Sequence, residues 1–280
     1  MLVFPNCKIN LGLLIIGKRL DGYHAIESIF YPVPLNDALE IIESASGEQQ
    51  LPGIGFSSSG NHIAGEVKDN LCVKACQLLK KDFFNLPPLN IHLYKAIPMG
   101  AGLGGGSADA AFALNLLNTK FKLNLSIKAL QAYALILGSD CPFFIMNEPC
   151  IATGRGEIMQ PVNLSLAGYY LLLVNPGIHI NTRWAFNQLD KKISTSSTNS
   201  TLQTAISQPV QLWKDSLPND FEPTVFETFP EIQIIKSTLY DLGALFAGMS
   251  GSGSTVFGIF EKKPTPPPFP PHYFVRSILL

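Results

Sequence analysis

The chain has 280 residues, of which 46% are hydrophobic and 15% charged, so it can bury a large core and suggests two domains more than one. Its 20 basic and 21 acidic residues give a formal net charge of −1, which excludes a global field that would steer the protein to nucleic acid or an anionic membrane. Five cysteines without a CxxC pair argue against a disulfide framework and a structural zinc site, and they favour a reducing cytoplasm.

Hydrophobic periodicity predicts an α+β order of elements, with no targeting or membrane-spanning segment. Strands are expected over residues 8–17, 37–44, 89–97 and 168–177. Helices are expected over residues 70–83, 107–121, 127–137 and 229–244, the third of them capped by Ser126 and ended by Gly138. The proline-rich segment 264–271 is expected to connect to a final strand, and residues 191–203 to form a polar surface loop. This order predicts two domains, residues 1–150 and 151–280.

The glycine-rich stretch GAGLGGGS at residues 100–107 lies between a predicted strand and a predicted helix. Glycine lacks a Cβ, so its N–H groups can approach a ligand closely, and the helix adds unpaired N–H groups and a positive dipole end. These features indicate a phosphate site. A Rossmann site is a rival reading, but no Asp or Glu lies between Asp109 and Asp140 to bind a ribose. A P-loop would need a lysine after Gly105, where this chain has Gly106. A tight turn without a ligand is a further alternative, but one or two glycines are enough for such a turn.

The segment PMGAGLGGGSADAA at residues 98–111 resembles the phosphate loop of the GHMP kinases, the family of galactose, homoserine, mevalonate and phosphomevalonate kinases. CKINLGL, LGSDCPFF and GMSGSGSTVF follow in that family's order, although PNCK stands where the family more often has Pro-Ala-Lys. DGYH at residues 21–24 is similar to the motif of one branch of the family, whose members phosphorylate a cytidylated acceptor in isoprenoid (terpenoid) biosynthesis.

This resemblance implies an α+β, two-domain fold with the active site in the cleft between the domains. It also implies an ATP- and Mg²⁺-dependent small-molecule kinase with no nucleic-acid or membrane partner. Two alternatives stay open: another kinase of the family, acting on mevalonate, homoserine or a sugar, and a non-catalytic nucleotide-binding sensor.

The resemblance places the ATP site in the N-terminal domain. Its expected residues are Asn70, Lys95, Pro98, Met99, Gly100, Ala101, Gly102, Leu103, Gly104, Gly105, Gly106 and Ser107. Asp69 is expected to cap the helix that follows it and Asn70 to contact the ribose, while Lys95 lies near the adenine or in solvent. Ser107 is expected at a helix N-cap, where its hydroxyl either caps the helix or reaches a phosphate or Mg²⁺. No other metal ligand is expected.

Asp140 is the expected catalytic carboxylate. It is the first acidic residue after Asp109, and at a helix C-terminus it gains nothing from the helix dipole, although it could also cap a turn. The family resemblance implies that it orients or deprotonates the acceptor hydroxyl with Lys8 close by. A lysine in an apolar first strand must find an anion or reach water, which fits this role.

Acceptor binding is expected to involve DGYH and the second domain. Tyr23 offers a flat face and His24 a hydrogen-bonding edge to a cytosine ring, with Phe186 as the candidate for the opposite face or as a core residue. Asn10 and Thr182 are expected to contact the sugar or the diphosphate. The loop of Gly251, Ser252 and Gly253 is expected to close over the site.

Overall fold

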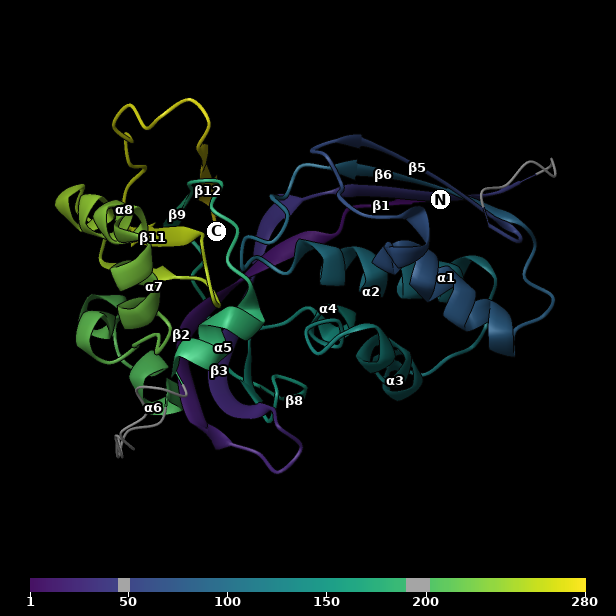
Figure 1. Ribbon diagram of the computed structural model, residues 1–280, viewed down its shortest axis with the longest axis horizontal. Helices are drawn as coiled ribbons and strands as arrows, with labels where there is room; N and C mark the ends of the chain where they lie inside the picture. The colour runs from purple at the N-terminus through teal and green to yellow at the C-terminus, as the bar shows by residue number, and fades with distance from the viewer. Residues whose placement is uncertain (45–50, 190–201) are drawn as a thin grey trace. The chain divides into compact units, whose positions relative to one another are not determined.

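The computed structural model describes residues 1–44, 51–189 and 202–280, which form two compact units (Figure 1). The first unit comprises residues 1–7, 35–99 and 104–148, and the second comprises residues 8–34, 100–103 and 149–280. The units therefore differ from a single division near residue 150. Residues 8–34 join the second unit because their strands pair in one sheet with strands that begin at Cys150.

The first unit is built on a sheet with strand order β1-β4-β6-β5. Its strands are β1 (Leu2–Val3), β4 (Ala38–Glu43), β6 (Leu89–Lys95) and β5 (Ile54–Gly60), and β6 pairs antiparallel with β4 and parallel with β5. The helical segments are η1 (Val67–Asp69), α1 (Leu71–Asp82), α2 (Gly105–Lys120), α3 (Ile127–Leu137) and α4 (Phe143–Met146). Helices α1 and α2 lie along one face of the sheet (Figure 1).

The alternating residues of β6 explain how this core forms. Leu89, Ile91 and Leu93 point to one face and are buried, and Lys95 continues the same alternation into the interior. They pack in one cluster with the small and aliphatic residues of α2, such as Ala110. A charged side chain at the end of an apolar row needs buried partners of opposite charge.

The two expected boundaries of α3 are confirmed, whereas the expected cap of α1 is not. Ser126 accepts a hydrogen bond from the Ala129 N–H at 3.3 Å, and Gly138 stands at the C-cap of α3. For α1, however, the cap is Asn70, whose Oδ1 accepts from Cys72 N at 2.9 Å. The expectation that Asp69 caps α1 was wrong, because the N-cap position falls one residue later.

The second unit contains two further sheets. One has the order β2-β3-β7-β8, formed by β2 (Asn6–Lys18), β3 (His24–Asn36), β7 (Cys150–Thr153) and β8 (Ile158–Pro161). Residues 6–7 of β2 and 35–36 of β3 belong to the first unit. The other has the order β10-β11-β9-β12, formed by β10 (Phe246–Met249), β11 (Val256–Phe260), β9 (Tyr170–Asn175) and β12 (Phe274–Leu279). Strand β9 has a partner on each side, which explains its continuous run of buried residues.

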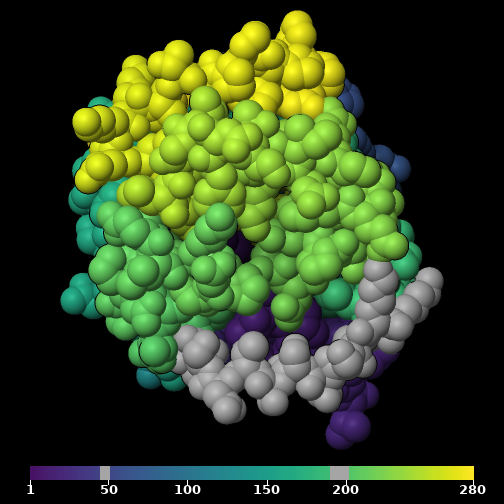
Figure 2. Space-filling model, turned by 90° about the vertical axis from the view of Figure 1, so that its left-hand side faces the viewer, coloured from purple at the N-terminus to yellow at the C-terminus, as the bar shows by residue number. Residues whose placement is uncertain are grey.

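Helical segments of the second unit are α5 (Thr182–Leu189), α6 (Leu202–Ile206), η2 (Val210–Asp215), α7 (Glu222–Thr228) and α8 (Pro230–Asp241). Figure 2 shows the face of this unit to which α7 and α8, in yellow-green, contribute, and α8 packs against β10 and β11. The C-terminal residues, in yellow, lie beside them, and the proline-rich segment leads into the expected final strand, β12. The predicted loop over residues 191–203 lies almost wholly outside the described residues. No helix in the described ranges is long and apolar enough to cross a membrane.

Candidate active site

The glycine-rich loop presents its backbone as an anion-binding surface. Gly100, Gly102 and Gly104 have φ values of +62°, +77° and +70°, so left-handed residues alternate with Ala101 and Leu103. Such alternation directs successive N–H groups to the same side of the chain. Only glycine adopts these angles without strain, which explains the spacing of the motif.

Hydrogen bonds in the second unit hold the carbonyl oxygens of this loop. The carbonyl of Ala101 accepts from Thr255 N at 3.3 Å, that of Gly102 from Ser250 Oγ at 2.8 Å, and that of Leu103 from Lys8 N at 2.9 Å. Because the carbonyls face protein donors, the N–H groups on the opposite side of these peptides stay available to a ligand. A Cβ on Gly102 would lie 2.1 Å from the Ser250 carbonyl oxygen. The loop at residues 100–107 and the glycine-rich segment at residues 250–253 therefore pack too closely for any residue other than glycine at position 102.

A cavity of about 460 Å³ opens beside these two segments, within the second unit. Its size is typical of a site for a small ligand. It is lined by Gly100, Gly102, His179, Ile180, Asn181, Thr182, Arg183, Ser252 and Gly253. The structure thus brings part of the predicted ATP loop together with three predicted acceptor residues, Thr182, Ser252 and Gly253. Thr182 Oγ1 and Ser252 Oγ lie 3.1 Å apart.

Lys8 lies in strand β2 and is only 4% exposed. Its Nζ donates to Asn10 Oδ1 at 2.5 Å and lies 4.6 Å from the centroid of the Phe30 ring. Asn10 in turn donates from Nδ2 to Ser28 Oγ at 2.8 Å, and its N–H donates to Ser250 Oγ at 3.2 Å. The predicted residues Lys8 and Asn10 are therefore linked through Ser250 to the glycine-rich loop.

In the first unit, Lys95 forms a buried ion triad that the sequence did not predict. Its Nζ donates to Asp109 Oδ2 at 2.7 Å and to Asp37 Oδ2, and its side chain is fully buried. Of the two alternatives for Lys95, the one in solvent is therefore wrong, and a position near the adenine stays a prediction. Asp37 Oδ1 also accepts from the N–H groups of Ala96 at 2.7 Å and Ile97 at 2.9 Å, which fixes the chain just before the glycine loop.

Asp109 carries a strongly perturbed carboxyl in this triad. Burial raises its pKa to about 7, against the lowering effect of Lys95, and the neighbouring charge of Asp37 adds to the rise. Among the described residues, its Oδ1 is a buried oxygen without a hydrogen-bond partner. For Lys95, burial acts to lower the pKa, but the two carboxylates outweigh it and raise the pKa. The triad therefore holds the Lys95 cation between two acids, of which Asp109 has a raised pKa.

A smaller cavity of about 130 Å³ lies within the first unit, with Lys95 and Asp109 of the triad in its wall. Four predicted ATP residues line it: Asn70, Lys95, Met99 and Gly106. The remaining lining residues are Ile63, Ala64, Glu66, Asp69, Leu71, Leu93 and Asp109. Apolar walls with a few polar groups are typical of a base-binding pocket. Asn70 uses its Oδ1 as a cap, so a nucleotide contact would fall to its amide nitrogen, whereas Asp69 pairs with Lys74 at 3.1 Å.

Ser107 does not occupy the predicted N-cap. Helix α2 begins at Gly105 with Gly104 as its N-cap, which places Ser107 in the first turn. Its hydroxyl contacts the Cys141 thiol; burial raises the pKa of that thiol to about 12, and the Ser107 hydrogen bond lowers it in part. Gly104 has a left-handed φ and takes the N-cap position, so α2 begins three residues earlier than it would with Ser107 as its cap.

Asp140 follows the C-cap of α3 and precedes the short helix α4. Ser139 Oγ donates to Asp140 Oδ1 at 3.5 Å, and the side chain is partly exposed. A partly exposed carboxylate on a short connection between two helices can reach a ligand, as its predicted role requires. Its catalytic role stays a prediction.

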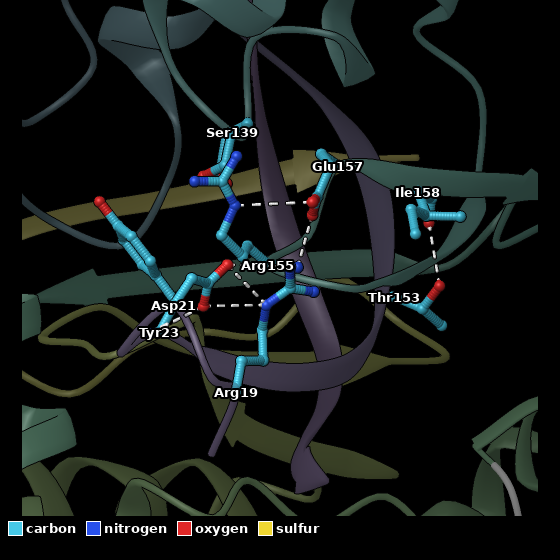
Figure 3. Close-up of polar contacts among 9 residues, drawn as sticks. Arg19, Asp21, Tyr23, Ser139, Thr153, Arg155, Glu157 and Ile158 are labelled. Carbon is cyan, nitrogen blue, oxygen red and sulfur yellow. Dashed lines mark hydrogen bonds and ion pairs between the residues drawn. The ribbon is translucent and has the colours of Figure 1, made fainter. Parts of the chain in front are cut away.

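The predicted acceptor residues near the β2–β3 turn do not form a simple sandwich. Tyr23 is 57% exposed, whereas His24 is buried and stacks on Phe186 with a centroid distance of 4.7 Å and an interplanar angle of 10°. Such a distance leaves no room for a base between His24 and Phe186. Phe186 also meets the edge of Phe221, which favours the packing alternative for Phe186. Figure 3 shows that Tyr23 instead lies beside Arg155, whose Cζ is 5.0 Å from the ring centroid.

Two models for the N- and C-terminal domains of GHMP kinases match residues 70–148 and 203–267. A protein of Bacteroides fragilis (strain YCH46) named 4-diphosphocytidyl-2-C-methyl-D-erythritol kinase is 52% identical over 93% of this chain and 92% of its own length. The chain belongs to the GHMP kinase family. A relative with the same name from Parabacteroides distasonis is 47% identical and covers 99% of this chain and 96% of its own.

Solved structures agree with this GHMP kinase assignment. A crystal structure of 4-(cytidine 5'-diphospho)-2C-methyl-D-erythritol kinase matches with a TM-score of 0.76 and 29% identity, covering 92% of this chain and 90% of the other. Mevalonate kinase of Methanococcus jannaschii matches with a TM-score of 0.71 at 14% identity, over 100% of this chain and 98% of the other, and supports the fold alone. The α+β, two-domain GHMP kinase fold is thus confirmed.

Sequence reasoning missed several polar residues of this GHMP kinase. They are Asp37, Asp109, Arg155, Glu157, His179, Asn181 and Arg183. Some carried a usable signal: residues 179–183 form a polar stretch directly after the buried strand β9, and Arg155 stands between two glycines. Asp37 and Asp109 carried none, because only the pairing of β4 with β6 and the docking of α2 bring them to Lys95.

Proposed function

We propose that this GHMP kinase transfers the γ-phosphate of ATP to the 2-hydroxyl of 4-diphosphocytidyl-2-C-methyl-D-erythritol, a step of the non-mevalonate route of isoprenoid biosynthesis. The single structural observation behind the proposal is the glycine-rich loop. Three carbonyls of this loop are held by protein donors, and its left-handed glycines turn N–H groups toward a ligand. The full-length similarity to kinases of that name supports the choice of acceptor.

In phosphoryl transfer the protein mainly positions the reactants and stabilises charge. We assign the ATP phosphates to the loop from Gly100 to Ser107 and the adenine to the cavity with Lys95 and Asp109 in its wall. Asp140 would orient or deprotonate the acceptor hydroxyl, and the Lys8 ammonium, held by Asn10, would stabilise the negative charge that develops on the reacting oxygens.

Mg²⁺ is proposed to bind with ATP, where it would neutralise charge on the phosphates. Among the described residues no group of three or more His, Cys, Asp or Glu is arranged to hold a metal. Ser107, in the first turn of α2, is the residue of the loop with a hydroxyl to offer such an ion. We place the reaction in the cytoplasm, where ATP is supplied.

A panel of acceptors with ATP and Mg²⁺, read out as ADP release, tests the proposal. The cytidylated erythritol should be turned over, and mevalonate, homoserine and galactose should not. Faster turnover of one of these three would assign the chain to another branch of the family. ATP binding without turnover of any acceptor would favour the nucleotide-binding sensor instead.

A further inference from the structure

The turn that carries the exposed Tyr23 ring is fixed by polar contacts of its own. The backbone N–H of Tyr23 donates to Asp21 Oδ1 at 3.2 Å, and Arg19 in turn binds Asp21 through Nη2 at 2.9 Å. The Arg19 hydrogen bond lowers the pKa of Asp21 and so keeps it an anion. The turn between β2 and β3 is therefore fixed at its backbone, independently of anything that touches the ring.

Arg155 fixes the ring itself. Its guanidinium carbon lies 5.0 Å from the Tyr23 centroid, within the range of a cation–π contact. The ring is nonetheless 57% exposed, so Arg155 covers only part of its surface and leaves room for a second flat group. Arg155 and Tyr23 are 132 residues apart in the sequence (155 minus 23), so this contact is a product of the fold.

Glu157 holds Arg155 in this position (Figure 3). One carboxylate oxygen accepts from Arg155 N at 2.5 Å, and the other lies 3.5 Å from Nε. Partial burial acts to raise the pKa of Glu157, but backbone donors and Arg155 outweigh it and lower the pKa. A Cβ on Gly154 would lie 2.7 Å from Glu157 Oε2, so the glycine makes this close approach possible.

Sheet pairing brings the two turns together. Strands β3 and β7 pair with Ser28 opposite Ala152, and Ile26 N donates to the Gly154 carbonyl at 2.8 Å. This register places the turn that follows β7 beside the residues that begin β3. The pairing of β3 with β7 thus brings the side chains of Arg155 and Tyr23 into contact.

We propose that Arg155 is a positioning residue that fixes the Tyr23 ring as a stacking platform for the pyrimidine base of the acceptor. This inference rests on the proposed function, because the platform needs a nucleoside in the acceptor. A ring already held in its binding orientation loses less conformational freedom when a base stacks on it. The Arg155 guanidinium then acts on the ligand through the Tyr23 ring and does not bind the phosphates.

The test measures binding of cytidine diphosphate by calorimetry, together with the KM values of acceptor and ATP. Arg155→Ala should weaken cytidine diphosphate binding and raise the acceptor KM about fivefold to tenfold, while the KM of ATP stays within twofold. Arg155→Lys keeps the charge without the flat group and should recover only part of the loss. Arg276→Ala is the matched control, because Arg276 also stacks 5.0 Å from an aromatic ring, that of Phe274 on β12, and it should leave both KM values unchanged.

A double-mutant cycle separates positioning from direct contact. In a Tyr23→Ala background, Arg155→Ala should cause no further loss of cytidine diphosphate binding. An equal, additive loss there would mean that Arg155 contacts the ligand itself, and it would overturn the proposal. Unchanged binding in a folded Arg155→Ala protein would overturn it too, as would a wild-type protein that does not bind cytidine diphosphate. Binding without kinase turnover would reject only the proposed function.

Discussion

The buried triad of Lys95, Asp37 and Asp109 makes a prediction about stability and pH. Asp109→Asn should not destabilise the protein at pH 8, although it removes one member of a buried ion network. The reason is the pKa of Asp109, which burial raises from 3.8 to about 7. Between these two pH values the folded protein holds one proton more than the unfolded chain, so this group's contribution to stability falls as the pH rises from about 4 to about 7.

The magnitude follows from the size of the shift. Each pKa unit corresponds to about 1.4 kcal/mol, so ionised Asp109 costs the folded state on the order of 4 kcal/mol above pH 7. Asparagine cannot ionise, and its amide oxygen still accepts a hydrogen bond from Lys95. The free energy of unfolding of Asp109→Asn relative to wild type should therefore rise by about 1.4 kcal/mol for each pH unit between pH 5 and pH 7.

Urea denaturation at pH 5, 6, 7 and 8 measures this difference. Asp37→Asn is the control, because Asp37 accepts two backbone N–H bonds as well as the Lys95 bond. Losing that carboxylate should cost about 3–5 kcal/mol, as is usual when one partner of a buried ion pair is removed. A loss of more than about 2 kcal/mol at pH 8 for Asp109→Asn, with no dependence on pH, would show that Asp109 is a stably ionised partner and would contradict this prediction.

Three further predictions concern catalysis and ligand binding. Asp140→Asn should abolish phosphoryl transfer while ATP affinity stays within a few-fold; a residual rate within about tenfold of wild type, about 1.4 kcal/mol of barrier, would remove its catalytic role. Gly104→Val should raise the KM of ATP before that of the acceptor because φ is +70° there, whereas Gly106→Ala, whose Cβ would meet only Leu71 at 3.8 Å, should bind ATP normally. Tyr23→Ala should lose about 1–3 kcal/mol of acceptor binding and Tyr23→Phe much less; a lower melting temperature with an unchanged acceptor KM would instead indicate a packing role.

Local patterns determined which segments of this chain become helices and strands. Strand β6, helix α3 with its Ser126 cap, and strand β9 follow from alternation, capping residues and apolar runs, because these signals act over a few residues. The conformation of the glycine-rich loop could also be predicted from the sequence, because glycine adopts its left-handed backbone angles without strain. The boundaries were less predictable: Asn70 rather than Asp69 caps α1, and α2 starts at Gly105, not at Ser107.

The motifs could be recognised from the residues alone: the phosphate loop, an isolated lysine in the first strand, and a lone acid after a long stretch without one. Their neighbours in space depend on how the chain folds. From the sequence, Lys95 could lie near the adenine or in solvent, yet strand pairing and the docking of α2 bury it between Asp37 and Asp109. The sequence suggested that Tyr23 and His24 act together on one ligand. In the structure the register of β3 and β7 places Arg155 against Tyr23, while His24 stacks on Phe186. Such partners come from distant parts of the chain, and the free energy of burying or pairing a charged group depends on those partners, which no local pattern contains.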